Sequence, residues 1–589
     1  MNIENDEYNV MIRRGLILLI SVLTLWFLWQ SFTFAMLRFY NLDEFRYAHA
    51  AWLVSEGKTP YIDFWDHKFP FLYQVLSLLY LFVDSGPLNF QYMRLLMFPL
   101  MLITLFSAYL INRRTDAVWA LLAPLLMLSI RSFVFVVVEI QPDAMAVAFF
   151  FSSIAILYFN KRFPWASGFF AGLLFTLSVW TSQKVFCYGL IFPVALMLDI
   201  KYNSYRKSGY LLGNPVAFIS GSIVVLVFLF YYLVSKDALA EWYRWTIDYT
   251  LLKYKDAYPS YSRWRTFGLL WHDGAGIFYF AFVGLSSTIR SLRQKGKECW
   301  NDPDILVVMA FPLCFFVWFL QRGAWLFSLL PFFAILAIFA ARGLVSFARR
   351  VIGIMSFPAG KWKLFTSLAT ILIMCHFVSA ISRGRLEPTP KNHYQKRILK
   401  IIGEISDKQD PIYDNSGSYI SRPHAYSPYF TNAMIRVKWA DQISQEVPKA
   451  ILKSGCTVFI PDGRHKGLPE TLQKWIAKHF LPFNKDIHLW GKKFKVTGAG
   501  QLDSKFTSVR EAKYFIRPAK ILNQGRLRID GDLIESRVFL LKAGDRQVRF
   551  DGSPGVSFEI LWLPRNGEMS EGRIELIPGD EPYGMIRYW

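Results

Sequence analysis

Cysteine is scarce in this chain, which has five among its 589 residues, at positions 187, 299, 314, 375 and 456. Only Cys456 falls in the polar last third of the sequence, and no Cys-x-x-Cys pair occurs. An exported domain built from that part therefore has no internal disulfide framework. Its stability has to come from a hydrophobic core.

Several functional signatures are missing as well. The sequence holds no Walker motif, no histidine cluster with metal-ligand spacing, no short-period repeat and no low-complexity tract. It therefore gives no sign of a P-loop nucleotide site, a histidine-rich metal centre or a repeat architecture. The first residues also show no signal-peptide cleavage pattern, so we expect an uncleaved first membrane span.

Apolar residues dominate what is present. Hydrophobic residues make up 53% of the chain and aromatic residues 17%. Apolar stretches of about 17–25 residues recur along the first two thirds, and this is the length that crosses a bilayer as a helix. The pattern predicts a polytopic α-helical membrane protein.

The formal net charge of +22 is compatible with nucleic-acid binding, but its distribution argues against such a partner. Many Lys and Arg residues fall in short clusters between apolar segments, at 13–14, 113–114, 161–162, 201–207, 290–297 and 342–350. Basic residues collect at the cytoplasmic ends of membrane helices and attract anionic membrane lipids. We therefore interpret the charge as a topology signal.

All of these clusters fall on one side if the chain crosses the membrane about eleven times, with the N-terminus inside and the C-terminus outside. The expected spans are 15–36, 92–110, 118–138, 144–159, 165–180, 185–198, 212–234, 267–288, 305–320, 325–341 and 364–380. Residues 71–83 are apolar but short, which predicts a juxtamembrane or re-entrant helix. The expected location is the inner membrane of a bacterium, with the last 200 or so residues in the periplasm.

Three domains are expected on this basis. Residues 1–383 form the transmembrane domain that we expect to be catalytic. Residues 384–499 form an α/β domain, because strand patterns at 456–460 and 487–496 flank an amphipathic helix pattern at 468–480. Residues 500–589 alternate in polarity between Gly, Asp and Pro turns, which predicts a β-sandwich.

The first outer loop carries the pair Asp43-Glu44 directly after the first span. Ionisable groups at the end of a membrane helix usually face a cavity and serve a function. The same loop also carries Asp63, Asp66 and Lys68, and the other outer loops add the polar and charged residues Glu139, Asp143, Gln183, Lys184, Gln321 and Arg322. One face thus collects the acids, amides and cations that an active site would need.

These motifs resemble the GT-C superfamily of membrane glycosyltransferases, and within it the protein O-mannosyltransferases and the aminoarabinose transferase of lipid A. The resemblance covers residues 15–345, and 395–497 more loosely. It is carried by Asp43-Glu44 after the first span, Lys68-Phe-Pro70, Gln141-Pro-Asp143, Gln183-Lys184, and Gln321-Arg322 followed by Leu330-Pro331-Phe332.

The resemblance implies transfer of a sugar from a polyprenyl-phosphate donor to a hydroxyl of an envelope acceptor, with inversion. The acceptor would be lipid A or lipopolysaccharide, another cell-surface glycan, a lipid or a protein. Asp43 would be the general base, and Glu44 would orient the acceptor or neighbouring groups. The implied ligands of the donor phosphate are Lys68, Lys184 and Arg322, and those of the substrate are Asp143, Gln183, Gln321 and Tyr73. No residue is assigned to a metal, although a divalent cation stays open as a cofactor.

Structural interpretations of the same residues stay open. Lys68 and Lys184 could be interface anchors, and Asp143 could be a helix N-cap. At the level of the whole protein, a transporter or flippase of lipid-linked glycans would also carry charges near the membrane, but the chain shows no internal repeat. A third alternative is a non-catalytic glycan-binding scaffold.

The topology can be tested directly. We expect a reporter that is active only in the cytoplasm to be silent when fused after Trp589, because the C-terminal domains are predicted on the outer side with Asp43. Fusions after the basic clusters at 113–114 and 290–297 serve as active controls. Reporter activity after Trp589 would mean that the span count is wrong by one. The loop residues grouped here on the outer side would then lie on different sides of the membrane.

Overall fold

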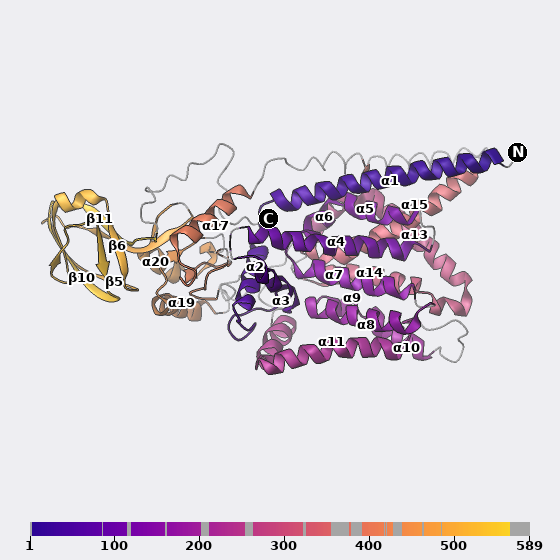
Figure 1. Cartoon of the computed structure of the whole chain (residues 1–589), viewed down its shortest axis with the longest axis horizontal. Helices are drawn as coiled ribbons and strands as arrows, with labels where there is room; N and C mark the ends of the chain where they lie inside the picture. Colours follow the sequence, from indigo (N-terminus) through magenta and orange to yellow (C-terminus); the bar gives the residue numbers. More distant parts are fainter. Residues whose placement is uncertain are drawn as a thin grey trace. The chain divides into compact units, whose positions relative to one another are not determined.

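The computed structural model of the chain (Figure 1) describes residues 3–84, 86, 88–114, 119–159, 162–201, 211–253, 263–321, 325–354, 376–377, 392–417, 419, 421–427, 439–461, 465–484 and 486–565. A helical N-terminal region with several apolar helices is followed by a part that contains β-sheets, which confirms the predicted fold class. The chain divides into two compact units. The helical unit comprises Met1–Arg38, His67–Leu76 and Gln91–Pro390, and the sheet unit comprises Phe39–Asp66, Ser77–Phe90 and Lys391–Trp589.

The helical unit is built from long apolar helices and short connecting ones (Figure 1). Its α-helices are α1 (Ile3–Leu37), α3 (Phe71–Ser77), α4 (Asn89–Asn112), α5 (Leu122–Ser129), α6 (Arg131–Val137), α7 (Pro142–Leu157), α8 (Pro164–Thr181), α9 (Val185–Tyr188), α10 (Ile191–Lys201), α11 (Pro215–Ser235), α12 (Leu239–Trp242), α13 (Arg263–Gln294), α14 (Asp304–Leu320) and α15 (Leu330–Ile354). Shorter helical turns are η2 (Trp119–Leu121), η4 (Tyr243–Lys253), η6 (Gly296–Asn301) and η7 (Leu326–Leu329).

Among the described residues, four helical segments are long and apolar enough to cross a membrane: Arg14–Leu37, Asn89–Asn112, Pro215–Ser235 and Leu326–Ala348. All four lie where spans were predicted. The shorter apolar helices α7 and α14 also coincide with predicted spans. The last expected span, 364–380, lies outside the described residues apart from 376–377, and the total of about eleven spans stays a prediction.

Three expected spans are interrupted. In the segment 267–288, which lies in α13, Gly274 departs from helical geometry, with φ −153° and ψ 22°. The segment 118–138 is divided into two helical pieces that meet at an angle of 78°. Ile130 between them is extended, with φ −80° and ψ 104°, which interrupts the helical hydrogen bonds just before the exposed Arg131. The segment 185–198 likewise separates into α9 and α10, because the first helix ends at Gly189.

Glycines allow two pairs of helices in the helical unit to approach backbone to backbone. A Cβ atom on Gly284 of α13 would lie 1.9 Å from the carbonyl oxygen of Phe339 in α15, and one on Gly343 would lie 1.8 Å from that of Phe280. Gly172 of α8 meets α11 in the same way, 2.0 Å from the Phe218 oxygen. Small residues at such crossings are typical of membrane helix pairs, since packing rather than water drives their association.

The sheet unit combines short helices with two β-sheets. Its helices are α2 (Leu42–Ser55), η1 (Leu78–Leu81), α17 (His393–Ile405), α19 (Ala440–Ser454), η9 (His465–Gly467), α20 (Glu470–His479) and η10 (Ala519–Asn523). Its strands are β1 (Ile412–Tyr413), β2 (Val458–Phe459), β3 (Phe480–Pro482), β4 (His488–Lys495), β5 (Gln501–Ser508), β6 (Ala512–Arg517), β7 (Gly525–Ile529), β8 (Asp532–Leu533), β9 (Val538–Leu541), β10 (Gly544–Gly552) and β11 (Ser557–Trp562).

One sheet has the order β1-β2-β4-β11-β6-β9, with β3 also paired to β4, and the other has the order β5-β10-β7-β8. The helix and strands expected at 468–480, 456–460 and 487–496 correspond to α20, β2 and β4. Strand β4 pairs with β11 from Ser557↔Lys495 to Leu561↔Gly491, so hydrogen bonds join residues on both sides of the boundary expected at 499/500. The division into two domains there stays a prediction.

Aromatic side chains form the core where the two sheets meet. Phe494 of β4 stacks on Phe558 of β11 with ring centroids 5.1 Å apart, and Phe550 of β10 lies 5.7 Å from Phe558. Trp562 of β11 is 3% exposed. The alternating polarity of these strands therefore buries one face of each sheet against the other.

The contact between α13 and α15 generates a stability prediction. Gly284→Ala should destabilise the protein by about 1–3 kcal/mol, because the added methyl group forces two backbones apart. Gly268→Ala is the matched control in the same helix, since a Cβ there meets nothing within 4 Å and alanine favours helix by up to ~1 kcal/mol. The measurement is the thermal unfolding midpoint of each purified variant in detergent. Equal midpoints for the two variants would show that the helices do not pack this closely.

Candidate functional site

Helix α2 carries the Asp43-Glu44 pair at its first turn. Asn41 is the N-cap, and the Glu44 carboxylate accepts a hydrogen bond of 2.9 Å from the Asn41 backbone N–H, completing a capping box. Glu44 is fully buried, whereas Asp43 is half-buried. The two acids thus have different environments: Glu44 stabilises the helix start, and Asp43 is the one with surface that a ligand can reach.

The position of α2 is fixed inside the sheet unit. Arg46 forms a buried ion pair with Asp66. Just before the helix, the Tyr40 backbone N–H donates to the Gln395 side chain at 2.6 Å, and the Gln395 amide donates back to the Tyr40 carbonyl at 2.9 Å. This reciprocal pair ties the start of α2 to α17, so the helix that carries Asp43 folds with the C-terminal part of the chain.

A second tie lies in the middle of α2. His49 Nε2 is 3.2 Å from His424 Nδ1, and the Tyr419 ring meets His49 edge-on at 4.9 Å. Gly417 passes so close, with φ +73°, that a Cβ there would lie 3.1 Å from the His49 Cβ. These contacts indicate a structural role for His49.

The helical unit brings together Asp143 and Lys184 from two predicted outer loops. Lys184 Nζ lies 2.9 Å from Asp143 Oδ2, and Ser182 Oγ donates to Asp143 Oδ1 at 3.3 Å. The side chains are 10% and 6% exposed, and the ammonium lies 4.0 Å from the centroid of the Phe327 ring. This is a nearly enclosed ion pair with a cation–π contact.

The interpretation of Asp143 as a helix N-cap is wrong. The N-cap of α7 is Gln141, and Asp143 lies one residue inside the helix after Pro142. Its carboxylate is engaged by Lys184 and Ser182 instead of the helix backbone. Lys184 is a nearly enclosed partner of that carboxylate.

Two more of the predicted site residues of the helical unit, Gln183 and Gln321, form hydrogen bonds. Gln183 donates from its amide to the His67 carbonyl, next to the half-buried Lys68. Gln321 accepts a 2.6 Å hydrogen bond from Ser328. Tyr73 is fully buried, so its exposure gives no support to a substrate contact. Arg322 lies outside the described residues.

Sequence reasoning missed the partner of Glu139. Arg38, at the end of α1, forms a buried ion pair with Glu139, donates to the Phe135 carbonyl at 2.6 Å and stacks over the Phe135 ring at 3.4 Å. Arg94 then donates to the Arg38 carbonyl at 2.8 Å. The available signal was a lone arginine five residues before Asp43, at the outer end of the first span.

No group of three or more His, Cys, Asp or Glu side chains in the described part of the chain could hold a metal ion. The charged side chains of the candidate sites are instead paired with one another. Arg46 and Asp66 belong to the sheet unit, while Asp143, Lys184, Arg38 and Glu139 belong to the helical unit.

Comparison with known proteins places this geometry in a fold. No family model and no curated protein sequence matches the chain. The structure is similar to apo ArnT from Cupriavidus metallidurans, with a TM-score of 0.53, 14% identity, and coverage of 81% of this chain and 98% of that one. It is also similar to the archaeal oligosaccharyltransferase AglB from Archaeoglobus fulgidus in complex with an inhibitory peptide and a dolichol-phosphate, with a TM-score of 0.50, 10% identity, and coverage of 90% and 74%. Both belong to the GT-C superfamily, so the chain has the GT-C-like fold that its motifs implied.

Two half-buried histidines of the sheet unit predict a pH dependence. Burial lowers the pKa of His424 from its usual 6.5 to about 4, with Lys58 adding to the effect and Asp63 opposing it. The unfolded chain takes up a proton near pH 6.5 and the folded chain near pH 4, so this stabilisation is complete above pH 6.5 and is lost as the pH falls towards 4. Burial also lowers the pKa of His488 to about 4.

We therefore expect the full-length protein in detergent to lose hydrogen-exchange protection in peptides from residues 42–55 and 392–427 between pH 7 and pH 5, after correction for intrinsic exchange. His424→Gln keeps a polar side chain but cannot take up the proton, so its protection should vary less with pH. An identical pH dependence in His424→Gln and the unchanged protein would contradict the assignment.

Proposed function

We propose that the chain is a membrane glycosyltransferase that moves a sugar from a polyprenyl-phosphate donor to a hydroxyl of an envelope acceptor. The observation that carries this proposal is the state of Asp43 within a GT-C-like fold. Asp43 lies in the first turn of α2, where it is half-buried, next to Glu44, which completes the capping box that fixes the start of the helix. A positioned carboxylate of this kind is what proton abstraction from a hydroxyl needs.

In the proposed reaction, Asp43 accepts the proton of the acceptor hydroxyl as its oxygen attacks the anomeric carbon. The bond from that carbon to the donor phosphate oxygen breaks at the same time, so one displacement inverts the anomeric centre. The leaving phosphate gains charge and needs a cation beside it. Lys68 is half-buried, and the carbonyl of the preceding residue, His67, accepts a hydrogen bond from Gln183. This supports Lys68 as the first candidate for the cation beside the phosphate.

Lys184 has a different part in this proposal. Its charge is already balanced by Asp143 at 2.9 Å, so an approaching phosphate has to compete with that carboxylate. Asp143 thus sets how strongly Lys184 attracts the donor. The segment before α15 contributes two further candidates, Arg322 for the donor phosphate and Gln321 for the substrate.

Asp43→Asn tests the proposal directly. The change keeps the shape of the side chain but removes its ability to accept a proton, so sugar transfer should fall by about 10²–10⁴. The assay uses protein purified in detergent, a panel of radiolabelled polyprenyl-phosphate sugars, and an extract of envelope lipids and glycans as acceptor. Asp63→Asn is the matched control, because Asp63 is an exposed acid in the same loop.

Near-normal transfer by Asp43→Asn would identify another group as the base. A transporter or flippase, or a glycan-binding scaffold, would transfer no sugar in detergent even as the unchanged protein. The same assay therefore separates these alternatives from the enzyme.

A further inference from the structure

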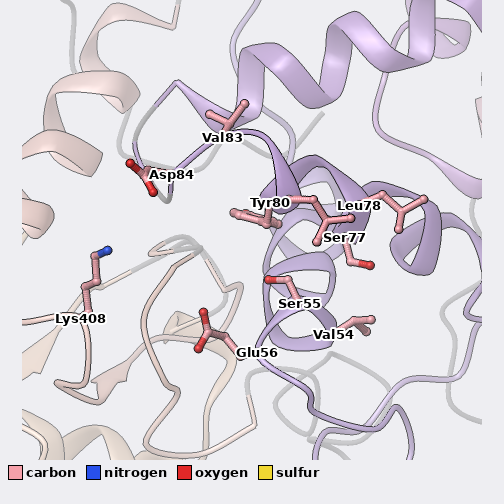
Figure 2. A pocket seen from close by; sticks show the side chains of 10 residues that line it. Val54, Ser55, Glu56, Ser77, Leu78, Tyr80, Val83, Asp84 and Lys408 are labelled. Atoms are coloured by element: carbon pink, nitrogen blue, oxygen red, sulfur yellow. The ribbon is translucent and has the colours of Figure 1, made fainter.

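A cavity of about 440 Å³ lies in the sheet unit, at the opposite end of α2 from Asp43 (Figure 2). Its wall is formed by the end of α2, by the segment around η1, and by Lys408, which follows α17. The volume falls within the roughly 300–1,000 Å³ of small-molecule sites. Neither Asp43 nor the Asp143–Lys184 pair lines it.

The lining has a particular donor and acceptor composition. Figure 2 shows the carboxylates of Glu56 and Asp84 and the ammonium of Lys408 bordering the same space, with the Tyr80 ring on another side of it. An ionised carboxylate only accepts hydrogen bonds and an ammonium only donates them, whereas a hydroxyl does both. A ligand rich in hydroxyls can therefore satisfy all three groups.

Apolar surface completes the match. Leu78 and Tyr80 are also among the residues that line the cavity. A sugar ring carries hydroxyls at its rim and C–H groups on its face, so it can meet carboxylates and an apolar wall at once. Glu56, Asp84 and Lys408 are exposed, which leaves the cavity accessible from solvent.

The charges argue against a phosphate in this cavity. Two carboxylates and one ammonium give a net charge of −1, which disfavours an anion. The donor phosphate of the proposed reaction therefore does not belong here. A neutral saccharide meets no such repulsion.

Distance separates the cavity from the reaction. Asp43 and Ser55 are 12 positions apart in α2, which at 1.5 Å per residue corresponds to about 18 Å. The sugar unit whose hydroxyl reacts at Asp43 cannot also fill the cavity. A ligand that uses both places has to be several sugar units long.

We infer that the acceptor is an oligosaccharide chain, and that this cavity binds one of its sugar units remote from the reacting hydroxyl. The inference rests on the proposed function and names its acceptor class. Remote binding of this kind strengthens capture of long acceptors and leaves the chemical step unchanged. It predicts that affinity and KM depend on acceptor length through Glu56, Asp84 and Lys408.

The test uses full-length protein in detergent and neutral oligosaccharides released by mild acid from the envelope of the cells that make it, separated into two-unit and six-unit fractions. Calorimetry without donor measures binding of the six-unit fraction, and the transfer assay measures KM and kcat for both. The variants are Glu56→Gln, Asp84→Asn and Lys408→Ala. Glu470→Gln is the matched control, an exposed acid on α20 outside the cavity.

Each cavity variant should weaken binding of the six-unit fraction by about tenfold, the loss expected for a hydrogen bond to a charged group. KM for the six-unit acceptor should rise by the same factor, while kcat should not change. The control Glu470→Gln should match the unchanged protein in binding, KM and kcat. If Glu56→Gln and Asp84→Asn bind the six-unit fraction as tightly as the unchanged protein does, the inference is overturned. It is also overturned if only Lys408→Ala loses affinity for that fraction and the unchanged protein binds inorganic phosphate. Binding is read without donor, so it decides the cavity even if the protein transfers no sugar and the proposed function fails.

Discussion

A charge placed among apolar helices has to meet a counter-charge, and this requirement organises the helical unit. The desolvation of an ion costs several kcal/mol, which only a close partner with further hydrogen bonds offsets. Arg38 meets Glu139, and Lys184 meets Asp143. At a third point, Arg342 of α15 lies 2.8 Å from Asp304 at the start of α14 and 2.8 Å from Asn112 at the end of α4. Each pair joins elements that are distant in sequence, so the pairs define which helix ends lie together.

The sequence predicted this arrangement in part. Apolar length gave the positions of α1, α4, α7, α11 and α14, because a bilayer-crossing helix has a minimum length that is visible in any sequence. The distribution of basic residues predicted that the loops containing Asp143 and Lys184 share one side, and the ion pair between these residues agrees with that grouping. The interruption at Ile130 had no such signal, since an extended residue between two apolar segments leaves hydropathy unchanged.

The finer roles depend on contacts that sequence spacing does not contain. Asp43 and Glu44 are adjacent acids, but successive residues point about 100° apart around a helix. Because of this difference in direction, Glu44 reaches back to the Asn41 backbone N–H, whereas Asp43 is half-buried at the helix start. The pairing of Arg342 with Asp304 was likewise hidden, because Arg342 stands first in a basic cluster that the charge pattern explained as a topology signal.

The hydrogen bonds between Tyr40 and Gln395 join residues that are 355 positions apart. During synthesis, the segment with Asp43 is made early, but the residue that holds the start of α2 in place is added only after the described membrane helices are complete. Contacts of such long range form late in folding, since the intervening chain has to be ordered first. The partner of His49, His424, is synthesised later still. A nascent chain that ends before Gln395 therefore lacks the contacts that hold the candidate catalytic helix in place.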